Sequence, residues 1–496
     1  MYTIGLDIGT SGVKSTVFDV KANIMGYAYC EYNISSTRQK TYTLSAFDVL
    51  NACVAVLRES AQRCGNPEKI KAISISSIGE SFVCLDKNDQ PLYDVMLYMD
   101  KRGTDECEEL TSGMSKQEIY SITGCYIDPM YAVYKLRWLA KNHPEVLDNT
   151  ARICFVADYI AFRLGADHVC DYSLAGRSGL LCLKDKSWWG YGTDFVGISK
   201  DKLPAPIPGG AVAGKVSAKM SAQLGGICAG TKIILGGHDQ IMTVIGSGAN
   251  RPGDVVNGMG TVDCLTSLVG ADIDKEQLLE NNMPLVPFLD QDAYATYAFN
   301  MSGGINNKWF CREMAKDLLG SANRYGELNK EATDVPSELI YFPYLCGGGT
   351  PQMDADTPAA MIGLRLNTTR GEMFRAVLEG TTYEMRYNLE QLEKCGSAIN
   401  RIMAVGGGSV SELWMQIRAD IYERKVEVPA IAEAGTIANA ILCYKALGVF
   451  GTVEEAQNAL IAKGKTYLPK EQNKSIYRNN YKRYLHLYTL LKELYH

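Results

Sequence analysis

Apolar and polar residues alternate at the start of the chain, where Ile4, Leu6 and Ile8 would share one face of a strand. Glycine and hydroxyl residues interrupt this run at 9–12, and β-branched character resumes immediately afterwards. The pattern predicts a β-hairpin with a polar tip. A strand, a Gly-Thr tip and a second strand recur over residues 255–265, which suggests two related domains that each open on such a hairpin.

Other segments follow a helical period or read as short apolar strands. We expect helices over residues 48–64, 128–142, 151–164, 241–248, 370–394 and 411–421. We expect strands over residues 70–76, 81–85, 232–235 and 401–405, and the first two of these to pair with each other. Tyrosines recur three or four residues apart at the C-terminal end, at Tyr477, Tyr481 and Tyr484, which favours a packing face.

A break in the pattern at residues 249–253, which include Pro252 and Gly253, marks a domain boundary. A length of 496 residues suits more than one domain, and we predict an α/β protein with domains over 1–248 and 249–496. A ligand cleft would lie at their boundary.

Charge and composition narrow the function classes. Lys and Arg total 50 against 56 for Asp and Glu, a net charge of −6, which disfavours a dedicated nucleic-acid binder. The N-terminus lacks a basic segment followed by an apolar core, and no stretch of about 18 apolar residues follows, so neither secretion nor membrane insertion is expected. The 15 cysteines are scattered singly, as reduced thiols in a cytoplasmic protein would be.

The tip of the first hairpin carries the residue types that hold phosphate. Asp7 ends a strand, Thr10 and Ser11 offer hydroxyls, Gly12 exposes its amide and Lys14 adds a point charge. Asp7 would lie near a divalent ion. Because Val13 rather than glycine precedes the lysine, this is not a Walker A loop, and an ordinary polar hairpin is an equal alternative on these residues alone.

Two further glycine-containing segments lie in the second half of the chain. Gly260 and Thr261 would add a second amide and hydroxyl pair. Residues 406–408 form a Gly-Gly-Gly turn before Ser411 and a helix, which would let a nucleotide approach the backbone. A GxGxxG fingerprint is absent, so a nicotinamide-dependent sugar dehydrogenase is disfavoured.

Asp239 is the strongest candidate for a catalytic group. It follows two glycines and a histidine at the predicted domain boundary, where a carboxylate could accept a proton from an attacking hydroxyl. The alternative is a helix N-cap for the segment that follows.

With these residues assembled, the chain resembles the FGGY carbohydrate kinases, which include glycerol kinase and xylulokinase, over essentially its whole length. Residues 359–364 and 372–379 fit the C-terminal signature of that family, and residues 135–142 fit its N-terminal signature. The resemblance implies two actin-like ATPase (ribonuclease H-like) domains, an active-site cleft between them, and use of ATP and Mg²⁺. It implies Asp239 as the general base and Asp7 near magnesium. The nucleotide-binding residues that it implies are Thr10, Ser11, Gly12, Lys14, Gly260, Thr261, Gly304, Lys308, Gly407 and Ser411.

The substrate-binding positions that the resemblance implies are Gly79, Glu80, Tyr98, Asp100, Met130, Asp239 and Gln240. Glu80 is similar to a polyol-binding glutamate of glycerol kinase, whereas Gly79 replaces its arginine and Tyr98 replaces the tryptophan common in the family. These changes should enlarge the pocket, so we expect a ketose, alditol or sugar acid of about four to six carbons.

Other assignments stay open at this stage. A strict xylulokinase or glycerol kinase, or a non-catalytic ATP- and sugar-binding sensor on the same fold, are the alternatives. The expected partners are the sugar or polyol and ATP, without nucleic acid or membrane, and the resemblance allows a homodimer.

Overall fold

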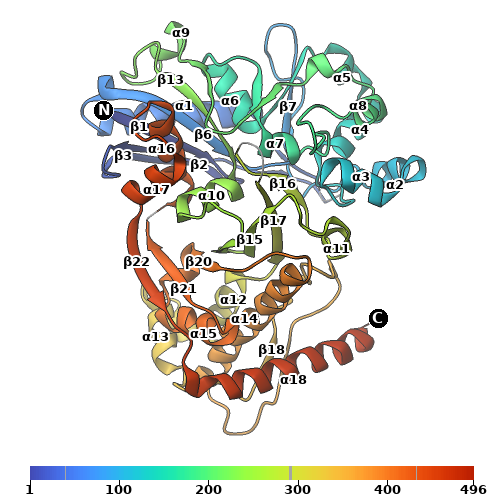
Figure 1. Cartoon of the computed structure of the whole chain (residues 1–496), viewed down its shortest axis with the longest axis vertical. Coiled ribbons are helices and arrows are strands. Elements are labelled where there is room, and N and C mark those ends of the chain that lie inside the picture. The colour runs from blue at the N-terminus through green and yellow to red at the C-terminus, as the bar shows by residue number, and fades with distance from the viewer. Residues whose placement is uncertain (39–40, 290–292, 432, 496) are drawn as a thin grey trace. The chain divides into compact units, whose positions relative to one another are not determined.

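A computed structural model describes residues 1–38, 41–289, 293–431 and 433–495 (Figure 1). The chain divides into two compact units. Unit 1 combines Met1–Asn250 with Pro284–Ala295 and Ile431–Ala462, and unit 2 combines Arg251–Met283 with Thr296–Ala430 and Lys463–His496. The first change of unit falls close to the expected boundary after residue 248, but the chain later returns to unit 1 twice. Each unit is therefore assembled from separate segments.

Unit 1 is built on a mixed sheet in the order β12-β13-β6-β1-β2-β3. Its strands are β1 Tyr2–Ile8, β2 Gly12–Asp19, β3 Ile24–Glu31, β6 Ile70–Ser77, β12 Val212–Lys215 and β13 Lys232–His238. The strands β1 and β2 form the predicted antiparallel hairpin, and β1, β6 and β13 run parallel. Unit 1 also contains shorter strands outside this sheet: β4 Ser35–Ser36, β5 Tyr42–Leu44, β7 Phe82–Leu85, β8 Val95–Met96, β9 Arg152–Phe155, β10 Val169–Asp171, β11 Ala205–Ile207 and β16 Leu285–Pro287.

Helices cover this sheet and extend unit 1. They are α1 Ala46–Arg63, α2 Thr104–Gly113, α3 Lys116–Thr123, α4 Ala132–Asn142, α5 Pro144–Asn149, α6 Val156–Leu164, α7 Tyr172–Gly176, α8 Gly190–Val196, α9 Ala218–Ser221, α10 Asp239–Ser247, α16 Ala434–Ala446 and α17 Val453–Leu460. Helix α16 packs on β1 and β6, while α1 packs on β2 and β3. A side chain at Gly5 would collide with the backbone of α16, since an added Cβ would lie 2.2 Å from the carbonyl oxygen of Thr436.

The structure corrects three local predictions in unit 1. The strands predicted at 70–76 and 81–85 form but do not pair, because β6 lies between β1 and β13 while β7 pairs with β9. The helix expected over 151–164 is strand β9 followed by α6, since a short apolar run does not separate the two states. The helix expected from residue 128 begins at Ala132, because Pro129 disfavours helical backbone in the residue before it.

Unit 2 contains a second mixed sheet, in which the strands run in the order β17-β15-β14-β20-β21-β22. These strands are β14 Asp254–Met259, β15 Asp263–Gly270, β17 Ala293–Asn300, β20 Arg401–Val405, β21 Val426–Ala430 and β22 Ala462–Tyr467, with a separate pair of β18 Ile340–Phe342 and β19 Ala360–Ile362. Its helices are α11 Lys275–Glu280, α12 Gly304–Met314, α13 Arg324–Glu331, α14 Arg370–Lys394, α15 Glu412–Tyr422 and α18 Glu471–Tyr495. The antiparallel β14–β15 hairpin is the second one predicted.

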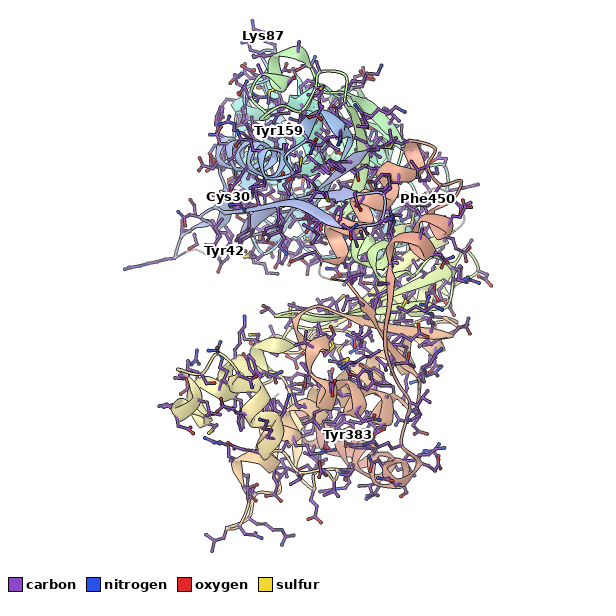
Figure 2. The ribbon with its side chains drawn as sticks, turned by 90° about the vertical axis from the view of Figure 1, so that its left-hand side faces the viewer. Cys30, Tyr42, Lys87, Tyr159, Tyr383 and Phe450 are labelled. Carbon is purple, nitrogen blue, oxygen red and sulfur yellow. The ribbon has the colours of Figure 1, made fainter. Side chains whose placement is uncertain are left out.

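The long helix α14 forms as predicted, with a capping box in which Thr369 and Glu372 satisfy each other's backbone amides. The C-terminal tyrosines form the predicted packing face, because the rings of Tyr477, Tyr481 and Tyr484 contact the buried ring of Tyr383. Figure 2 labels Tyr383. Within the described part of the chain, no helix is both long enough and apolar enough to cross a bilayer.

Candidate functional site

The first hairpin presents Asp7 and Lys14 opposite each other on neighbouring strands. The tip between them is tight, since the amide of Gly9 donates to the carbonyl oxygen of Gly12 at 2.9 Å and the hydroxyl of Tyr32 donates to the carbonyl oxygen of Gly9. This turn leaves Thr10 and Ser11 at the surface of unit 1, partly or fully exposed. The hairpin therefore has the hydroxyls, amides and cation expected of a phosphate loop.

Asp7 lies where the parallel strand β6 and the helix α16 meet the hairpin. Ser76 Oγ donates to its Oδ1 at 2.8 Å, and a Cβ at Gly435, in the first turn of α16, would lie 3.0 Å from its Oδ2. Lys14 Nζ pairs with Glu433 Oε2 at 2.8 Å. Burial raises the pKa of Asp7, and the charge of Glu433 adds to this, while the hydrogen bond from Ser76 and the charge of Lys14 oppose it.

Asp239 is the first residue of α10, immediately after β13. The N-cap position belongs to His238 and no side chain caps this end, so the N-cap alternative for Asp239 is wrong. Its side chain is 35 % exposed and its Oδ1 lies 3.1 Å from His238 Nε2. Local burial and the negative charges of Asp7 and Glu80 raise the pKa of Asp239 to about 7, whereas burial lowers the pKa of His238 well below its usual value. A neutral histidine thus accompanies a carboxylate with the pKa of a general base.

A hydrogen-bonded chain from helix α7 holds the end of β13 in place. The side chain of Asp171 caps α7 and accepts from the amide and hydroxyl of Ser173. Ser173 Oγ in turn accepts from the backbone amide of His238 at 2.9 Å. This chain fixes the backbone one residue before Asp239, so the direction of the Asp239 carboxylate depends on α7.

Glu80 and Arg177 form a buried ion pair beside Asp239. The guanidinium of Arg177 contacts Glu80 Oε1 through both Nε and a terminal nitrogen, and both side chains are only 6 % exposed. Gly79 lies against the imidazole of His238, where an added Cβ would be 2.8 Å from a ring carbon. The expectation that Gly79 enlarges the pocket is therefore wrong, because His238 and Arg177 fill the space that a side chain at 79 would take.

Tyr98, Met130 and Gln240 complete this group in unit 1. Tyr98 is 37 % exposed, and burial together with the charges of Glu80 and Asp239 raises the pKa of its hydroxyl, so the three side chains are neighbours. Met130 Sδ lies 3.6 Å from a terminal nitrogen of Arg177. Gln240 is half-buried next to Asp239 in the first turn of α10. The structure thus brings these predicted substrate-binding positions together.

Asp100 differs from the other predicted substrate-binding residues, because its carboxylate is fully buried. It accepts two side-chain hydrogen bonds from Arg102, at 2.9 and 2.6 Å, and two backbone hydrogen bonds, from the amides of Tyr42 and Arg102. With both oxygens engaged, Asp100 shapes the loop that carries Tyr98 and is not placed to accept from a ligand.

In unit 2 the predicted nucleotide-binding residues meet at the tip of the β14–β15 hairpin. Gly260 and Thr261 are exposed there. The amide of Gly304, the first residue of α12, donates to the carbonyl oxygen of Gly260 at 2.8 Å, and the amide of Gly303 donates to that of Thr261 at 2.9 Å. Lys308 lies one turn further along α12 and is exposed.

The glycine turn after β20 reaches the same hairpin. A Cβ at Gly406 would lie 3.0 Å from the carbonyl oxygen of Met259, the last residue of β14, whereas the position of a Cβ at Gly407 is open. Ser411 caps α15 by accepting from the amide of Trp414, and its hydroxyl also accepts from Asn329 at 3.1 Å. Gly407 is therefore placed for close approach of a ligand, while the hydroxyl of Ser411 is occupied by structural hydrogen bonds.

A buried arginine under this hairpin escaped the sequence analysis. Arg418 of α15 is fully buried, as is Asp263, and donates to Asp263 Oδ2 and Asn257 Oδ1. These two partners flank the exposed tip at Gly260 and Thr261. The sequence did not predict Arg177 or Arg418 as functional residues, because the partner of each lies about 100 residues or more away in the sequence. The residues next to each arginine do not indicate that partner. The one sequence signal for a buried arginine was its position among apolar or small residues.

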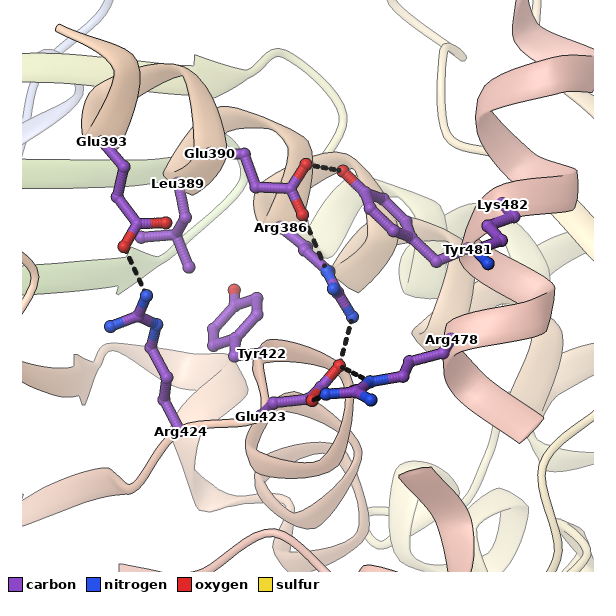
Figure 3. Close-up of a pocket in the computed structure, with 10 residues that line it drawn as sticks. All are labelled: Arg386, Leu389, Glu390, Glu393, Tyr422, Glu423, Arg424, Arg478, Tyr481 and Lys482. Carbon is purple, nitrogen blue, oxygen red and sulfur yellow. Dashed lines mark hydrogen bonds and ion pairs between the residues drawn. The ribbon is translucent and has the colours of Figure 1, made fainter. Parts of the chain in front are cut away.

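A separate cavity of about 590 Å³ in unit 2 contains none of the predicted site residues (Figure 3). Its walls come from α14, the end of α15 and α18, and most of the charged side chains there pair with one another. Arg386 contacts Glu390 and Glu423 at 3.1 and 3.3 Å, and Arg478 contacts Glu423 at 2.5 Å. These ion pairs join three helices, which accounts for the charged lining.

Comparisons with known proteins match both halves of the chain to one family. Residues 2–246 match the N-terminal domain and residues 255–447 the C-terminal domain of the FGGY family of carbohydrate kinases. This chain is an FGGY carbohydrate kinase. It is thus an ATP-dependent sugar kinase, a phosphotransferase, as the family resemblance led us to expect.

Named relatives of this FGGY kinase include two kinds of enzyme. A gluconokinase of Bacillus licheniformis is 28 % identical to this chain, and the alignment covers 96 % of this chain and 93 % of the gluconokinase. A xylulose kinase of Bacillus subtilis is 25 % identical, and the alignment covers 99 % of this chain and 98 % of the xylulose kinase. Among solved structures, a ligand-bound xylulose kinase of Lactobacillus acidophilus has a TM-score of 0.90 at 26 % identity, and a gluconate kinase of the same species has 0.89 at 25 %; each covers 100 % of this chain and 99 % of its own. The kinase has the actin-like ATPase fold of this family.

Proposed function

We propose that this kinase transfers the γ-phosphate of ATP to a hydroxyl of a polyhydroxy substrate bound beside Asp239, with that residue as general base. One observation carries the assignment: a partly exposed carboxylate begins α10, with a pKa of about 7, among Glu80, Tyr98 and Gln240. An aspartate of ordinary pKa would be too weak a base at neutral pH, whereas the pKa of Asp239 lies close to neutral pH.

The chemistry is an in-line displacement. Asp239 accepts the proton of the substrate hydroxyl as its oxygen bonds to the γ-phosphorus, and the bond from that phosphorus to the bridging oxygen breaks to release ADP. Thr10, Ser11 and Lys14 of unit 1 and Gly260, Thr261, Gly304 and Gly407 of unit 2 supply amides, hydroxyls and charge for ATP. Because the pair with Glu433 holds Lys14 at 2.8 Å, phosphate binding would compete with this contact.

The residues around Asp7 fit a magnesium ion. Mg²⁺ prefers one or two carboxylates together with water and nucleotide phosphates rather than a full protein cage. Asp7 and the neighbouring Glu433 supply carboxylates, and no cluster of three metal-binding side chains occurs among the described residues. Bound there with ATP, the ion would neutralise charge on the transferring phosphoryl group.

We propose a substrate of about four to six carbons. Such a substrate has more hydroxyls than glycerol, and the several polar side chains around Asp239 could each bind one of them. Tyr98 in place of a larger indole leaves room for it, although Gly79 does not. The relatives named gluconokinase and xylulose kinase indicate the same range. We place the reaction in the cytoplasm, where ATP is available, and allow a homodimer, which light scattering of the purified enzyme would detect.

Incubation with ATP, Mg²⁺ and a panel of ketoses, alditols and sugar acids, with ADP as the readout, tests this function. Turnover of glycerol above every longer substrate would contradict the proposed size. Asp239→Asn should lower kcat by roughly 10²–10⁴ with little change in nucleotide binding. Asp148→Asn, at an exposed position, is the matched control and should keep normal turnover. Near-normal kcat in Asp239→Asn would refute the base assignment.

A further inference from the structure

Glu80 has a backbone conformation that an ordinary side chain rarely adopts. Its φ is +58°, in the left-handed region, on the short connection between β6 and β7. Such a conformation is strained and persists only when surrounding contacts determine it. Glu80 is also buried, at 5 % exposure, so its position is specified by its neighbours.

The neighbour that specifies it is Arg177, which directly follows α7. Two of its nitrogens converge on Glu80 Oε1, its guanidinium lies 5.0 Å from the centre of the Tyr131 ring, and one nitrogen lies 3.6 Å from Met130 Sδ. Both nitrogens contact Glu80 Oε1, so the guanidinium fixes the orientation of the Glu80 carboxylate beside Asp239. The planar guanidinium suits this geometry, which a lysine could not reproduce.

The charge in this part of unit 1 is set by few groups. Glu80 neutralises Arg177, and His238 is uncharged. Lys135 lies nearby, but its ammonium is fully buried and donates to the carbonyl oxygen of Leu97 at 2.6 Å. Asp239 adds negative charge once it is ionised. A substrate carboxylate bound here would meet a cation that is already paired and would lie close to anionic groups, so its lost hydration would not be replaced.

We propose that the Arg177–Glu80 pair determines the substrate class of this kinase: it favours an uncharged ketose or alditol over a sugar acid of the same length. The inference rests on the proposed function, because it assigns the substrate of the site beside Asp239. The Glu80 carboxylate accepts a hydrogen bond from a substrate hydroxyl, and Arg177 is a positioning residue that holds Glu80 in its left-handed conformation and cancels its charge.

The first test compares kcat/KM of the wild-type enzyme for matched pairs, such as a pentulose against a five-carbon aldonate and mannitol or fructose against gluconate. We expect at least a tenfold preference for the uncharged member. Glu80→Gln leaves Arg177 with uncompensated charge, so the ratio of acid to uncharged substrate should rise by at least tenfold. Arg177→Met should raise KM for the uncharged substrate about 10- to 100-fold with KM for ATP unchanged, and Arg177→Lys should recover part of this loss.

Controls keep the outcomes distinct. Arg312→Met, at a 69 % exposed arginine of unit 2, should change neither ratio. Thermal shift of the wild-type enzyme with each sugar or acid alone measures preference without chemistry. A tenfold preference for the acid in turnover or thermal shift, or an unchanged ratio in Glu80→Gln, overturns this inference while the proposed function stands. Absence of both turnover and thermal shift with the whole panel overturns the proposed substrate size and this inference together.

Discussion

The raised pKa of Asp239 makes the pH profile of this kinase a direct test of its mechanism. Only the ionised carboxylate accepts a proton, so kcat/KM should rise with pH through about 7 and level off above it. Relative to the plateau, about 50 % of the rate would remain at pH 7, about 9 % at pH 6 and about 1 % at pH 5. An aspartate with an ordinary pKa of about 3.9 would keep about 90 % at pH 5.

The cause of the shift can be tested in the same profile. Besides burial, the charges of Asp7 and Glu80 raise the pKa of Asp239, and Arg177 lowers it. Removal of one negative neighbour in Glu80→Gln should therefore move the midpoint to lower pH, and Arg177→Met should move it to higher pH. The sign of each displacement follows from charge alone and does not depend on how tightly the sugar binds.

The assay measures ADP release at saturating ATP and low sugar from pH 5 to 9, with coupling enzymes in excess and circular dichroism at each pH to show that the protein stays folded. The Asp239→Asn variant should show a low rate without this midpoint. A wild-type profile that is flat between pH 5.5 and 8 in folded protein would refute the assignment of Asp239 as a base of raised pKa.

Three further predictions concern residues that support the site. Arg418→Met removes one partner of a fully buried ion pair and should cost about 3–5 kcal/mol of stability and raise KM for ATP. Arg424→Met, in a pair that is 35 % and 39 % exposed, should cost about 0–1 kcal/mol. Equal melting temperatures of the two variants would contradict this prediction. Ser173→Ala removes the hydroxyl that accepts from the His238 amide, so it should lower kcat about 10-fold with KM for ATP unchanged. An unaltered kcat would show that α7 does not position Asp239. Gly435→Ala places a Cβ 3.0 Å from Asp7 Oδ2 and should raise the Mg²⁺ concentration needed for half-maximal rate. Gly320→Ala, at a glycine with open space around it, should leave that concentration unchanged.

The two arginines missed in the sequence illustrate how this enzyme uses buried charge. Arg177 lies beside the proposed substrate-binding positions and Arg418 lies beneath the second hairpin. Each neutralises a buried carboxylate on a loop or strand that carries functional residues. A buried pair of this kind adds little net stability but penalises loss of either partner, so it specifies one conformation of the segment that it holds. Precise placement of reacting groups is what phosphoryl transfer requires.

The sequence by itself determined the features that repeat over short distances. Strand alternation located both hairpins, helical periodicity located α14 from Arg370 to Lys394, and glycine and hydroxyl residues marked the tips at 9–12 and 260–261. Family motifs then assigned the chemistry. These signals are readable because backbone geometry imposes periods of 2 and 3.6 residues on any buried face.

Only the tertiary structure decided which distant residues meet. It paired Glu80 with Arg177 across 97 positions, returned residues 431–462 to unit 1, occupied Asp100 with Arg102 and filled the space at Gly79 with His238. A buried carboxylate needs a partner, but its own sequence neighbourhood does not say which cation will supply it. That choice follows from how strands and helices far apart in the chain pack, and here it sets the charge around Glu80 and Asp239.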